Sequence, residues 1–201
     1  RALNARRHPG SAFKPCVYAT ALAAGYTPAS EVDDDPIDVV RGRQVWSPAN
    51  FNGEYLGKVT FRRALMSSLN AATVRVSQVV GIERIISQAQ KQGITSPIDP
   101  QPAIVLGAVD VTPMEMVRAY APFANGGFKV TPRLLRRIEA SDGSVMWSSE
   151  SAPLERVMDP RDSYQMTSML RSVVDYGTGR VIREWGVKGP VAGKTGTTNN
   201  G

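Results

Sequence analysis

Hydrophobic residues recur at helical spacing through most of this chain, and the first such stretch is the most apolar. Pro9 and Gly10 interrupt the chain, and the residues that follow, 11–24, are rich in alanine and apolar on most of their circumference. A helix that is apolar all round must be buried on every side. The pattern therefore predicts a central, buried helix that begins at Ser11 and ends before Gly25.

The second region of helical spacing begins at Thr60 and is interrupted once. Apolar residues first recur on one face, the pattern falters at Ser67, Ser68 and Asn70, and helical spacing then resumes as far as Val80. This interruption predicts two helices, with Ser68 and Asn70 in the turn between them.

Three later helices are predicted from boundary signals. Residues 82–92 are amphipathic and end at Gly93, a residue favoured just after a helix. Residues 112–115 combine a capping box with proline at the first helical position, and that helix should stop at residues 125–127. Asp159, followed by proline, begins the last of them. Helices therefore dominate the prediction.

Signals for strands are fewer. Residues 134–138 and 144–147 flank an Asp142–Gly143 turn, which predicts a hairpin. Residues 190–198 resemble the beginning of a strand, but no partner strand follows before Gly201. We therefore expect a helix-rich α+β chain in which strands on both sides of the last segment are missing.

Two kinds of charged segment are predicted to lie on the surface. Residues 26–55 are irregular, and the acidic run Asp33–Asp35 within them is expected to be a solvated turn. Three basic pairs, Arg6–Arg7, Arg62–Arg63 and Arg136–Arg137, contribute to a formal net charge of +6. They lack interleaved aromatic residues and any nucleic-acid motif, so they are interpreted as solvated faces and no nucleic-acid partner is expected.

Composition limits the remaining classes. The 201 residues are 42% hydrophobic and 21% charged, which suits one globular domain with a sizeable core. No apolar stretch is long enough to cross a bilayer. The basic first residues do not form a signal peptide, so the chain is expected to be an excerpt of a longer protein.

The scarcity of histidine and cysteine limits the catalytic chemistry that this chain can perform. His8 and Cys16 are the single histidine and the single cysteine, which excludes a zinc site and disfavours a Ser-His-Asp triad, so no metal is expected. A serine nucleophile then needs another base. Ser11 and Lys14 lie three residues apart and share one face of the predicted helix. Lys14 could deprotonate Ser11 if burial and a second nearby cation keep its amine neutral.

Two further motifs follow along the chain. Ser68 and Asn70 form a Ser-x-Asn pattern that is weak evidence alone, whereas the Lys-Thr-Gly of residues 194–196 would arise by chance only about 0.03 times. The hydroxyls of Thr195 and Thr197 beside that lysine could hold a carboxylate. Ser-x-x-K, Ser-x-Asn and Lys-Thr-Gly in this order are typical of penicillin-binding proteins and β-lactamases.

Beyond these motifs, the chain resembles the transpeptidase domain of class A penicillin-binding proteins, the bifunctional peptidoglycan synthases, over nearly its whole length. The stretches that carry the likeness are RHPGSAFKP around Ser11, WSPANF from Trp46, TFRRAL before SLN, LGAVDVTPMEM from Leu106 and GKTGTTN from Gly193. The resemblance implies a β-lactamase/transpeptidase-like fold, in which helices flank an antiparallel sheet and the helix from Ser11 is central. It also implies that residues 1–201 are one transpeptidase domain, incomplete at both ends.

The resemblance further implies the activity and the site. A D,D-transpeptidase of this family transfers an acyl group from a D-Ala-D-Ala stem peptide to a neighbouring amine, through a serine ester. By this likeness Ser11 is the nucleophile, Lys14 the general base, Ser68 the proton relay and Asn70 a hydrogen-bonding partner of the peptide. The residues that would bind the substrate carboxylate are Lys194, Thr195, Gly196, Thr197 and Thr198. The backbone amides of Ser11 and Thr197 would form the oxyanion hole.

Partners and location follow from the same likeness. Stem peptides and β-lactams are the expected ligands, no cofactor is expected, and D,D-carboxypeptidase side activity would accompany transpeptidation. The domain would lie on the extracytoplasmic face of the bacterial cytoplasmic membrane. A glycosyltransferase domain would precede it, and membrane attachment would come only from chain outside residues 1–201.

Three alternatives stay open. A β-lactamase shares these motifs, but a class A enzyme also uses a glutamate followed four residues later by asparagine, and none of the glutamates here has one. A class D type enzyme is not excluded by that absence. A domain that is acylated by β-lactams only to signal, or a remnant that merely binds glycan strands, would also fit the motifs.

Overall fold

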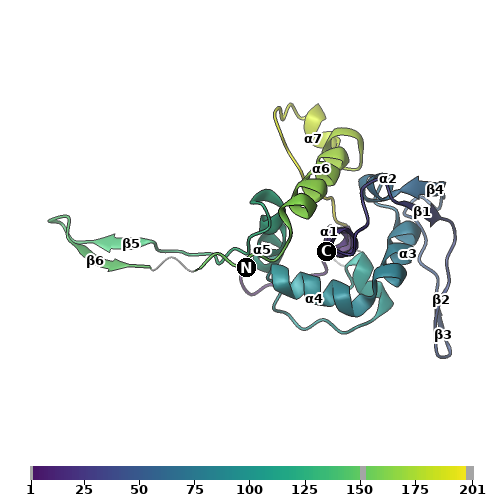
Figure 1. Cartoon of the computed structure of the whole chain (residues 1–201), viewed down its shortest axis with the longest axis horizontal. Coiled ribbons are helices and arrows are strands. Elements are labelled where there is room, and N and C mark those ends of the chain that lie inside the picture. The colour runs from purple at the N-terminus through teal and green to yellow at the C-terminus, as the bar shows by residue number, and fades with distance from the viewer. Residues whose placement is uncertain (1, 150–152, 198–201) are drawn as a thin grey trace.

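The computed structural model of the chain describes residues 2–149 and 153–197, and helices dominate them (Figure 1). The α-helices of this part are α1 (Lys14–Ala23), α2 (Phe61–Met66), α3 (Asn70–Val80), α4 (Ile82–Gln92), α5 (Pro113–Ala124), α6 (Pro160–Tyr176) and α7 (Val181–Glu184). Two 3-10 helices accompany them, η1 (Gly10–Phe13) and η2 (Pro102–Leu106). Among the described residues, none of the helices combines the length and apolar character that crossing a membrane requires.

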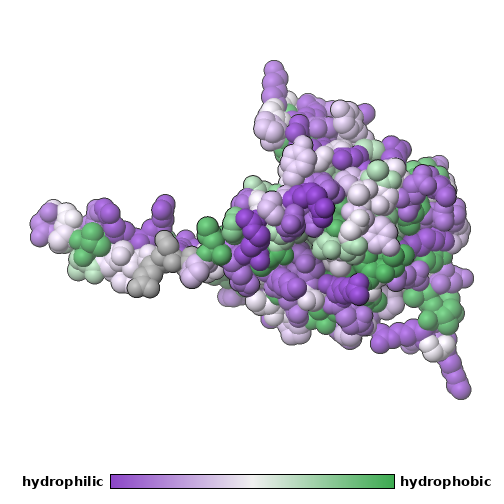
Figure 2. Space-filling model, viewed as in Figure 1, coloured by the Kyte–Doolittle hydropathy of each residue, from purple (hydrophilic) through white to green (hydrophobic). Residues whose placement is uncertain are grey.

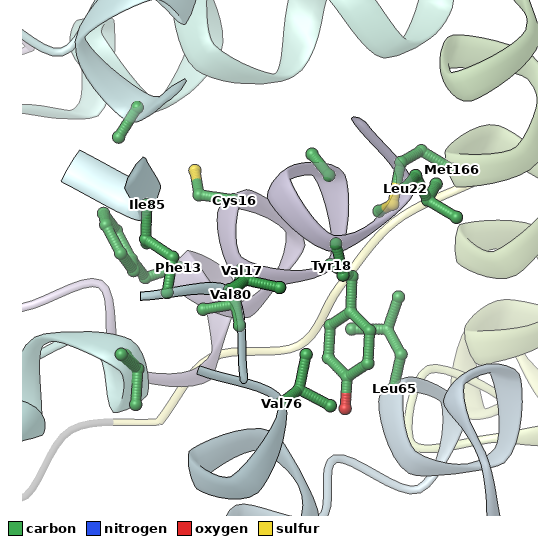
Figure 3. Packing of buried hydrophobic residues seen from close by; sticks show 14 of the residues in the cluster. Phe13, Cys16, Val17, Tyr18, Leu22, Leu65, Val76, Val80, Ile85 and Met166 are labelled. Carbon is green, nitrogen blue, oxygen red and sulfur yellow. The ribbon is translucent and has the colours of Figure 1, made fainter. Parts of the chain in front are cut away.

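Helix α1 is the centre of the molecule, as its composition predicts. Every residue from Lys14 to Leu22 is buried, and α2, α3, α4 and α6 all pack against the helix (Figure 1). Figure 3 shows side chains from opposite sides of η1 and α1 meeting these neighbours. Fully burying a side chain as large as Leu22 is worth about 1.5–3 kcal/mol. The core includes Phe13, Val17, Tyr18 and Leu22 from η1 and α1. Around them lie Leu65, Val76, Val80, Ile85 and Met166 from the surrounding helices.

The predicted central helix is correct except in its first turn, which is 3-10 rather than α. Proline at position 15 has no amide hydrogen, so it cannot donate to the carbonyl of Ser11 four residues earlier. The amide of Lys14 donates to that carbonyl instead, which is the shorter 3-10 spacing. Ser11 therefore lies in a tighter turn than the sequence pattern suggested.

The other predicted helices and the hairpin are confirmed. Residues 67–69 separate α2 from α3, α4 ends at Gly93, and both halves of the capping box between Thr112 and Glu115 are formed. The Asp159 side chain accepts a hydrogen bond from the amide of Arg161 and caps α6. Strands β5 (Arg137–Glu139) and β6 (Val145–Ser148) form an antiparallel hairpin that projects from the helical body (Figure 1). Figure 2 shows hydrophilic and hydrophobic residues mixed along this arm.

The prediction for residues 26–55 was wrong, because part of this segment is extended and paired. Strand β1 (Glu31–Asp34) runs antiparallel to β4 (Gly57–Thr60), and β2 (Val39–Arg41) pairs with β3 (Gln44–Trp46). These strands have three or four residues each, too few for a period-2 pattern to stand out from the surrounding polar residues. All three sheets in the described chain are two-stranded and antiparallel.

The strand predicted at residues 190–198 is also wrong for its described part, since residues 190–197 join no ladder with any described strand. They run instead as a single segment against the start of the chain and α6, where the amide of Gly193 donates to the carbonyl of Leu170. A strand is defined by a paired neighbour, and the described residues supply none here.

The expectation of solvated basic pairs holds for two of the three pairs. Arg6–Arg7 and Arg136–Arg137 are exposed, but Arg62 is half-buried. Its guanidinium donates to the carbonyl oxygen of Ser168 and the hydroxyl of Ser172, both at 2.9 Å. Arg62 therefore fastens α2 to α6, and the interpretation of this residue as part of a solvated face was wrong.

Candidate active site

The first site residue, Ser11, lies in η1 just ahead of the central helix. The preceding Gly10 has a φ of +53°, and a Cβ placed on it would lie 2.4 Å from the carbonyl oxygen of Thr197. Only glycine allows the two segments to approach so closely. Among the described residues, the Ser11 hydroxyl has no hydrogen-bond partner. It is half-buried at the N-terminal end of α1, where the helix dipole favours developing negative charge.

Lys14 is fully buried and its amine is held by the turn between α2 and α3. The Nζ atom donates to the carbonyl oxygen of Ser68 and to Oδ1 of Asn70, both at 2.7 Å, and lies 3.3 Å from the Ser68 hydroxyl. Burial lowers the pKa of Lys14 well below its usual value, the Lys194 cation lowers it further, and the Asp34 carboxylate acts in the opposite direction.

Ser68 joins two lysines. Its hydroxyl oxygen accepts hydrogen bonds from Nζ of Lys14 at 3.3 Å and from Nζ of Lys194 at 2.8 Å. Its φ of +57° makes it the single non-glycine residue with a left-handed backbone in the described ranges. Strained residues of this kind concentrate at functional sites. Ser68 lies between α2 and α3, as the interrupted pattern predicts.

The segment that contains Lys194 closes the site from the other side. Besides Ser68, its amine donates to the carbonyl oxygen of Thr195 at 3.1 Å, and burial lowers the pKa of Lys194 to about 8. The Thr195 hydroxyl lies 2.7 Å from the hydroxyl of Thr178. A Cβ on Gly196 would lie 2.6 Å from the Pro9 carbonyl oxygen, so this glycine also serves close packing.

The structure therefore brings three distant motifs together at one hydroxyl. Ser11 and Lys14 come from η1 and α1, Ser68 and Asn70 from the turn before α3, and Lys194 from the final segment. Thr197 is exposed and Thr198 lies outside the described residues. A serine, a buried lysine amine whose pKa is lowered and a second, half-buried lysine amine arranged in this way are suited to acyl transfer by a covalent route.

A family model described as the penicillin binding protein transpeptidase domain matches residues 1–201. The chain belongs to this family. Penicillin-binding protein 1A of Pseudomonas aeruginosa is 37% identical over an alignment that covers all of this chain and 30% of that protein. The expected class A resemblance is therefore confirmed, and the chain spans about a third or less of that relative.

Solved structures of penicillin-binding proteins share the fold. The crystal structure of penicillin-binding protein 1A from Haemophilus influenzae superposes with a TM-score of 0.91, at 28% identity, over 98% of this chain and 35% of that one. Penicillin-binding protein A of M. tuberculosis, in its imipenem acyl-enzyme complex, superposes at 0.85 with 24% identity, over all of this chain and 51% of that chain. The predicted fold class is confirmed.

One prediction near the candidate site was wrong. Asp34, expected in a solvated turn, is fully buried, and its carboxylate accepts hydrogen bonds from Asn50 and from the amides of Leu56 and Ala72. Asn50 in turn contacts the start of α3. Sequence reasoning missed both residues as parts of the site. Asn50 belongs to the WSPANF stretch, whose family likeness is the one sequence signal that marks it. The stretch contains no residue spacing that indicates a role for Asn50.

The LGAVDVTPMEM stretch supports the turn that contains Ser11. A Cβ on Gly107 would lie 2.1 Å from the carbonyl oxygen of Gly10, so the two backbones are in direct contact. Thirteen residues further on, the Tyr120 hydroxyl donates to the carbonyl oxygen of Ala12 at 2.7 Å. Both contacts fix the backbone on either side of Ser11.

Alanine at Gly107 is expected to destabilise the protein more than alanine at Gly25. Both glycines have left-handed φ values, +86° and +94°, so each substitution costs about 1–2 kcal/mol of backbone strain. Only Gly107→Ala also forces a side chain into the backbone of Gly10, which adds roughly 1–3 kcal/mol. Urea unfolding midpoints measure the difference. Equal midpoints for the two variants would contradict the contact.

Proposed function

We propose that residues 1–201 belong to the transpeptidase domain of a bifunctional peptidoglycan synthase and act as a D,D-transpeptidase with Ser11 as nucleophile. The observation that carries the proposal is the buried, hydrogen-bonded amine of Lys14, one helical turn from Ser11 and bridged to Lys194 through the Ser68 hydroxyl. A serine without a histidine needs such a neutral amine as its base.

The acylation step uses these groups in order. The Ser11 oxygen attacks the carbonyl carbon of the penultimate D-alanine while Lys14 accepts the hydroxyl proton. The backbone amides of Ser11 and Thr197 hold the oxyanion, and deleting one donor from such a site typically costs about 3–4 kcal/mol of transition-state stabilisation. The C–N bond then breaks, the departing D-alanine nitrogen receives a proton from Ser68, and Ser68 regains one from Lys14.

The hydrogen bonds of Ser68 suit this relay. A hydroxyl oxygen has two lone pairs and one proton. Both lone pairs of Ser68 face lysine amines, which leaves its proton free for the leaving group. In the second half of the reaction an amine of a neighbouring stem peptide gives a proton to Lys14 and attacks the carbonyl carbon of the Ser11 ester. The C–O bond then breaks, and Lys14 returns the proton to the Ser11 oxygen. Water in place of that amine gives D,D-carboxypeptidase side activity.

Substrate binding is assigned to the remaining motif residues. Asn70 uses one acceptor position for Lys14 and one N–H for the carbonyl oxygen of Ala49, so its amide retains one further donor and acceptor for the peptide backbone. Lys194 supplies positive charge for the terminal carboxylate. The residues that complete this carboxylate site are Thr195, Gly196, Thr197 and Thr198.

β-Lactams are expected to acylate the same serine, because their strained amide takes the place of the D-Ala-D-Ala bond. By its relation to the penicillin-binding proteins 1A, we assign the domain to the extracytoplasmic face of the cytoplasmic membrane and expect a glycosyltransferase domain ahead of it. Membrane attachment is assigned to chain outside these residues.

The decisive experiment is cross-link formation by the natural protein that contains this chain. Incubation with lipid-linked substrate bearing full stem peptides should give cross-linked muropeptide dimers and free D-alanine, both lost when a β-lactam is added. A domain that only senses β-lactams would bind penicillin without making dimers. Release of the penicilloyl group within seconds would identify a β-lactamase, and either result would reject the transpeptidase assignment.

A further inference from the structure

A buried carboxylate without a cationic partner lies beneath the site. Asp34, at the end of β1, is 0% exposed, and within the described ranges no lysine or arginine forms an ion pair with it. Neutral N–H groups surround it instead: Nδ2 of Asn50 at 2.9 and 3.0 Å, the Leu56 amide at 3.0 Å and the Ala72 amide at 3.3 Å. Burying an unpaired charge is costly, so the arrangement needs a compensating role.

Asn50 connects this carboxylate to the start of α3. Its side chain is nearly fully buried, and its Oδ1 accepts hydrogen bonds from the amides of Asn70 at 2.6 Å and Ala71 at 3.3 Å. Together with the Ala72 amide on Asp34, the first three N–H groups of α3 are satisfied from outside the helix. Leu69, at the N-cap position, provides no side-chain cap. Asp34 and Asn50 thus replace the missing cap.

Asn50 and the preceding Ala49 also determine where Asn70 points, and Asp34 acts on Asn70 through Asn50. Its backbone amide is held by Asn50, and its side-chain Nδ2 donates to the carbonyl oxygen of Ala49 at 2.7 Å. With both ends fixed, the remaining Oδ1 atom faces the Lys14 amine at 2.7 Å. A displacement of this amide would move the base relative to Ser11.

We propose that Asp34 and Asn50 are positioning residues for the general base: they cap α3, fix Asn70, and through it hold the Lys14 amine, while Asp34 supplies the negative charge of this cluster. The inference rests on the proposed function, since it assigns a purpose to the same base. Neither residue is expected to touch the substrate.

Charge and position can be separated by two variants. The groups that act on the Lys14 charge are the Lys194 cation, which lowers its pKa together with burial, and the Asp34 carboxylate, which raises it. In Asp34→Asn the Lys14 amine loses its proton at lower pH. The acid limb, which is the pH range over which the acylation rate rises as Lys14 is deprotonated, therefore moves to lower pH. In Asn50→Ser the Asp34 carboxylate remains, although it loses the Nδ2 donor, and the cap of α3 is weakened. The rising part of the pH profile therefore stays in place while the maximum rate falls.

The test measures the rate constant of fluorescent penicillin labelling against pH in the natural full-length protein. We expect the maximum rate to fall roughly 10-fold or more in both variants, because misplacing a catalytic group by 1 Å can cost about 100-fold. The final labelled amount reports the folded fraction, so the rate constant describes only the protein that folds. Matched controls are Asp33→Asn and Asn52→Ser, which make the same changes at exposed neighbours.

The outcomes distinguish this inference from the proposed function. If the wild-type protein is labelled at Ser11 and Asp34→Asn matches Asp33→Asn in both maximum rate and acid limb, the positioning role is rejected and the function stands. A fall in rate without a shift of the acid limb in Asp34→Asn rejects the electrostatic part. If the wild-type protein is not labelled, or Ser11→Ala still is, the proposed function itself fails.

Discussion

Replacing Ser11 with alanine is expected to abolish covalent labelling by fluorescent penicillin, with a loss in acylation rate of at least about 10⁴-fold. The substitution removes the single oxygen that can form the ester and leaves the packing of η1 unchanged, because the hydroxyl has no partner among the described residues. Removing a serine nucleophile from a comparable acyl-transfer site lowers kcat by about 10⁶-fold. Gel fluorescence after penicillin treatment, followed by mass spectrometry of the labelled peptide, measures the effect.

Ser47→Ala is the matched control for this experiment. Ser47 is exposed and directly follows β3, and its hydroxyl donates only to Asp38 at 2.6 Å, so its loss should leave the labelling rate unchanged. Persistent labelling of Ser11→Ala at the wild-type rate would mean that another residue carries the acyl group.

The second large effect is expected at Lys14. Alanine there removes the amine that Ser68 and Asn70 hold, and the rate of acylation should fall about 10²–10⁴-fold, the usual contribution of a general base. Initial binding of penicillin should change much less than the rate of the covalent step, because the Lys194 side of the pocket is retained. Stopped-flow labelling over a range of penicillin concentrations separates the two quantities.

The Lys14 amine should also determine how the acylation rate depends on pH. A base must be neutral, so acylation by the wild-type protein should rise as Lys14 loses its proton at a pKa well below the usual lysine value. The Lys194 amine must stay charged to attract a carboxylate, so the rate should fall again above a pH of about 8. The rising limb should vanish in Lys14→Ala and persist in Lys58→Arg, a change at an exposed lysine. A rising limb that survives in Lys14→Ala would assign the base to another group.

Helix positions and the three candidate motifs could be predicted from sequence because both leave local signals. Capping residues such as Thr112 and Asp159 act within one turn, and the apolar circumference of α1 is a property of ten consecutive residues. The order of the motifs along the chain predicts that Ser11, Ser68 and Lys194 lie together. Because these residues lie far apart along the chain, the prediction that they are close in space rests on family likeness and not on residue spacing.

The parts that escaped prediction depend on contacts between distant segments. Asp33, Asp34 and Asp35 are identical in sequence, and only the pairing of β1 with β4 decides which carboxylate faces inward. A shift of one residue in that register would bury a different aspartate. The 3-10 turn at Ser11 did have a local cause in Pro15, but its effect appears only when each carbonyl is matched with its donor.

The left-handed backbone of Ser68 also bears on how this domain can evolve. A glycine would occupy that conformation with about 1 kcal/mol less strain, and an apolar residue in place of Lys14 would fill the interior without a buried amine. Selection for thermal resistance alone would therefore favour both exchanges, and each would remove a group that the proposed mechanism uses for proton transfer. Thermostable variants of this domain should accordingly gain their stability elsewhere, at surface and loop positions remote from these two side chains.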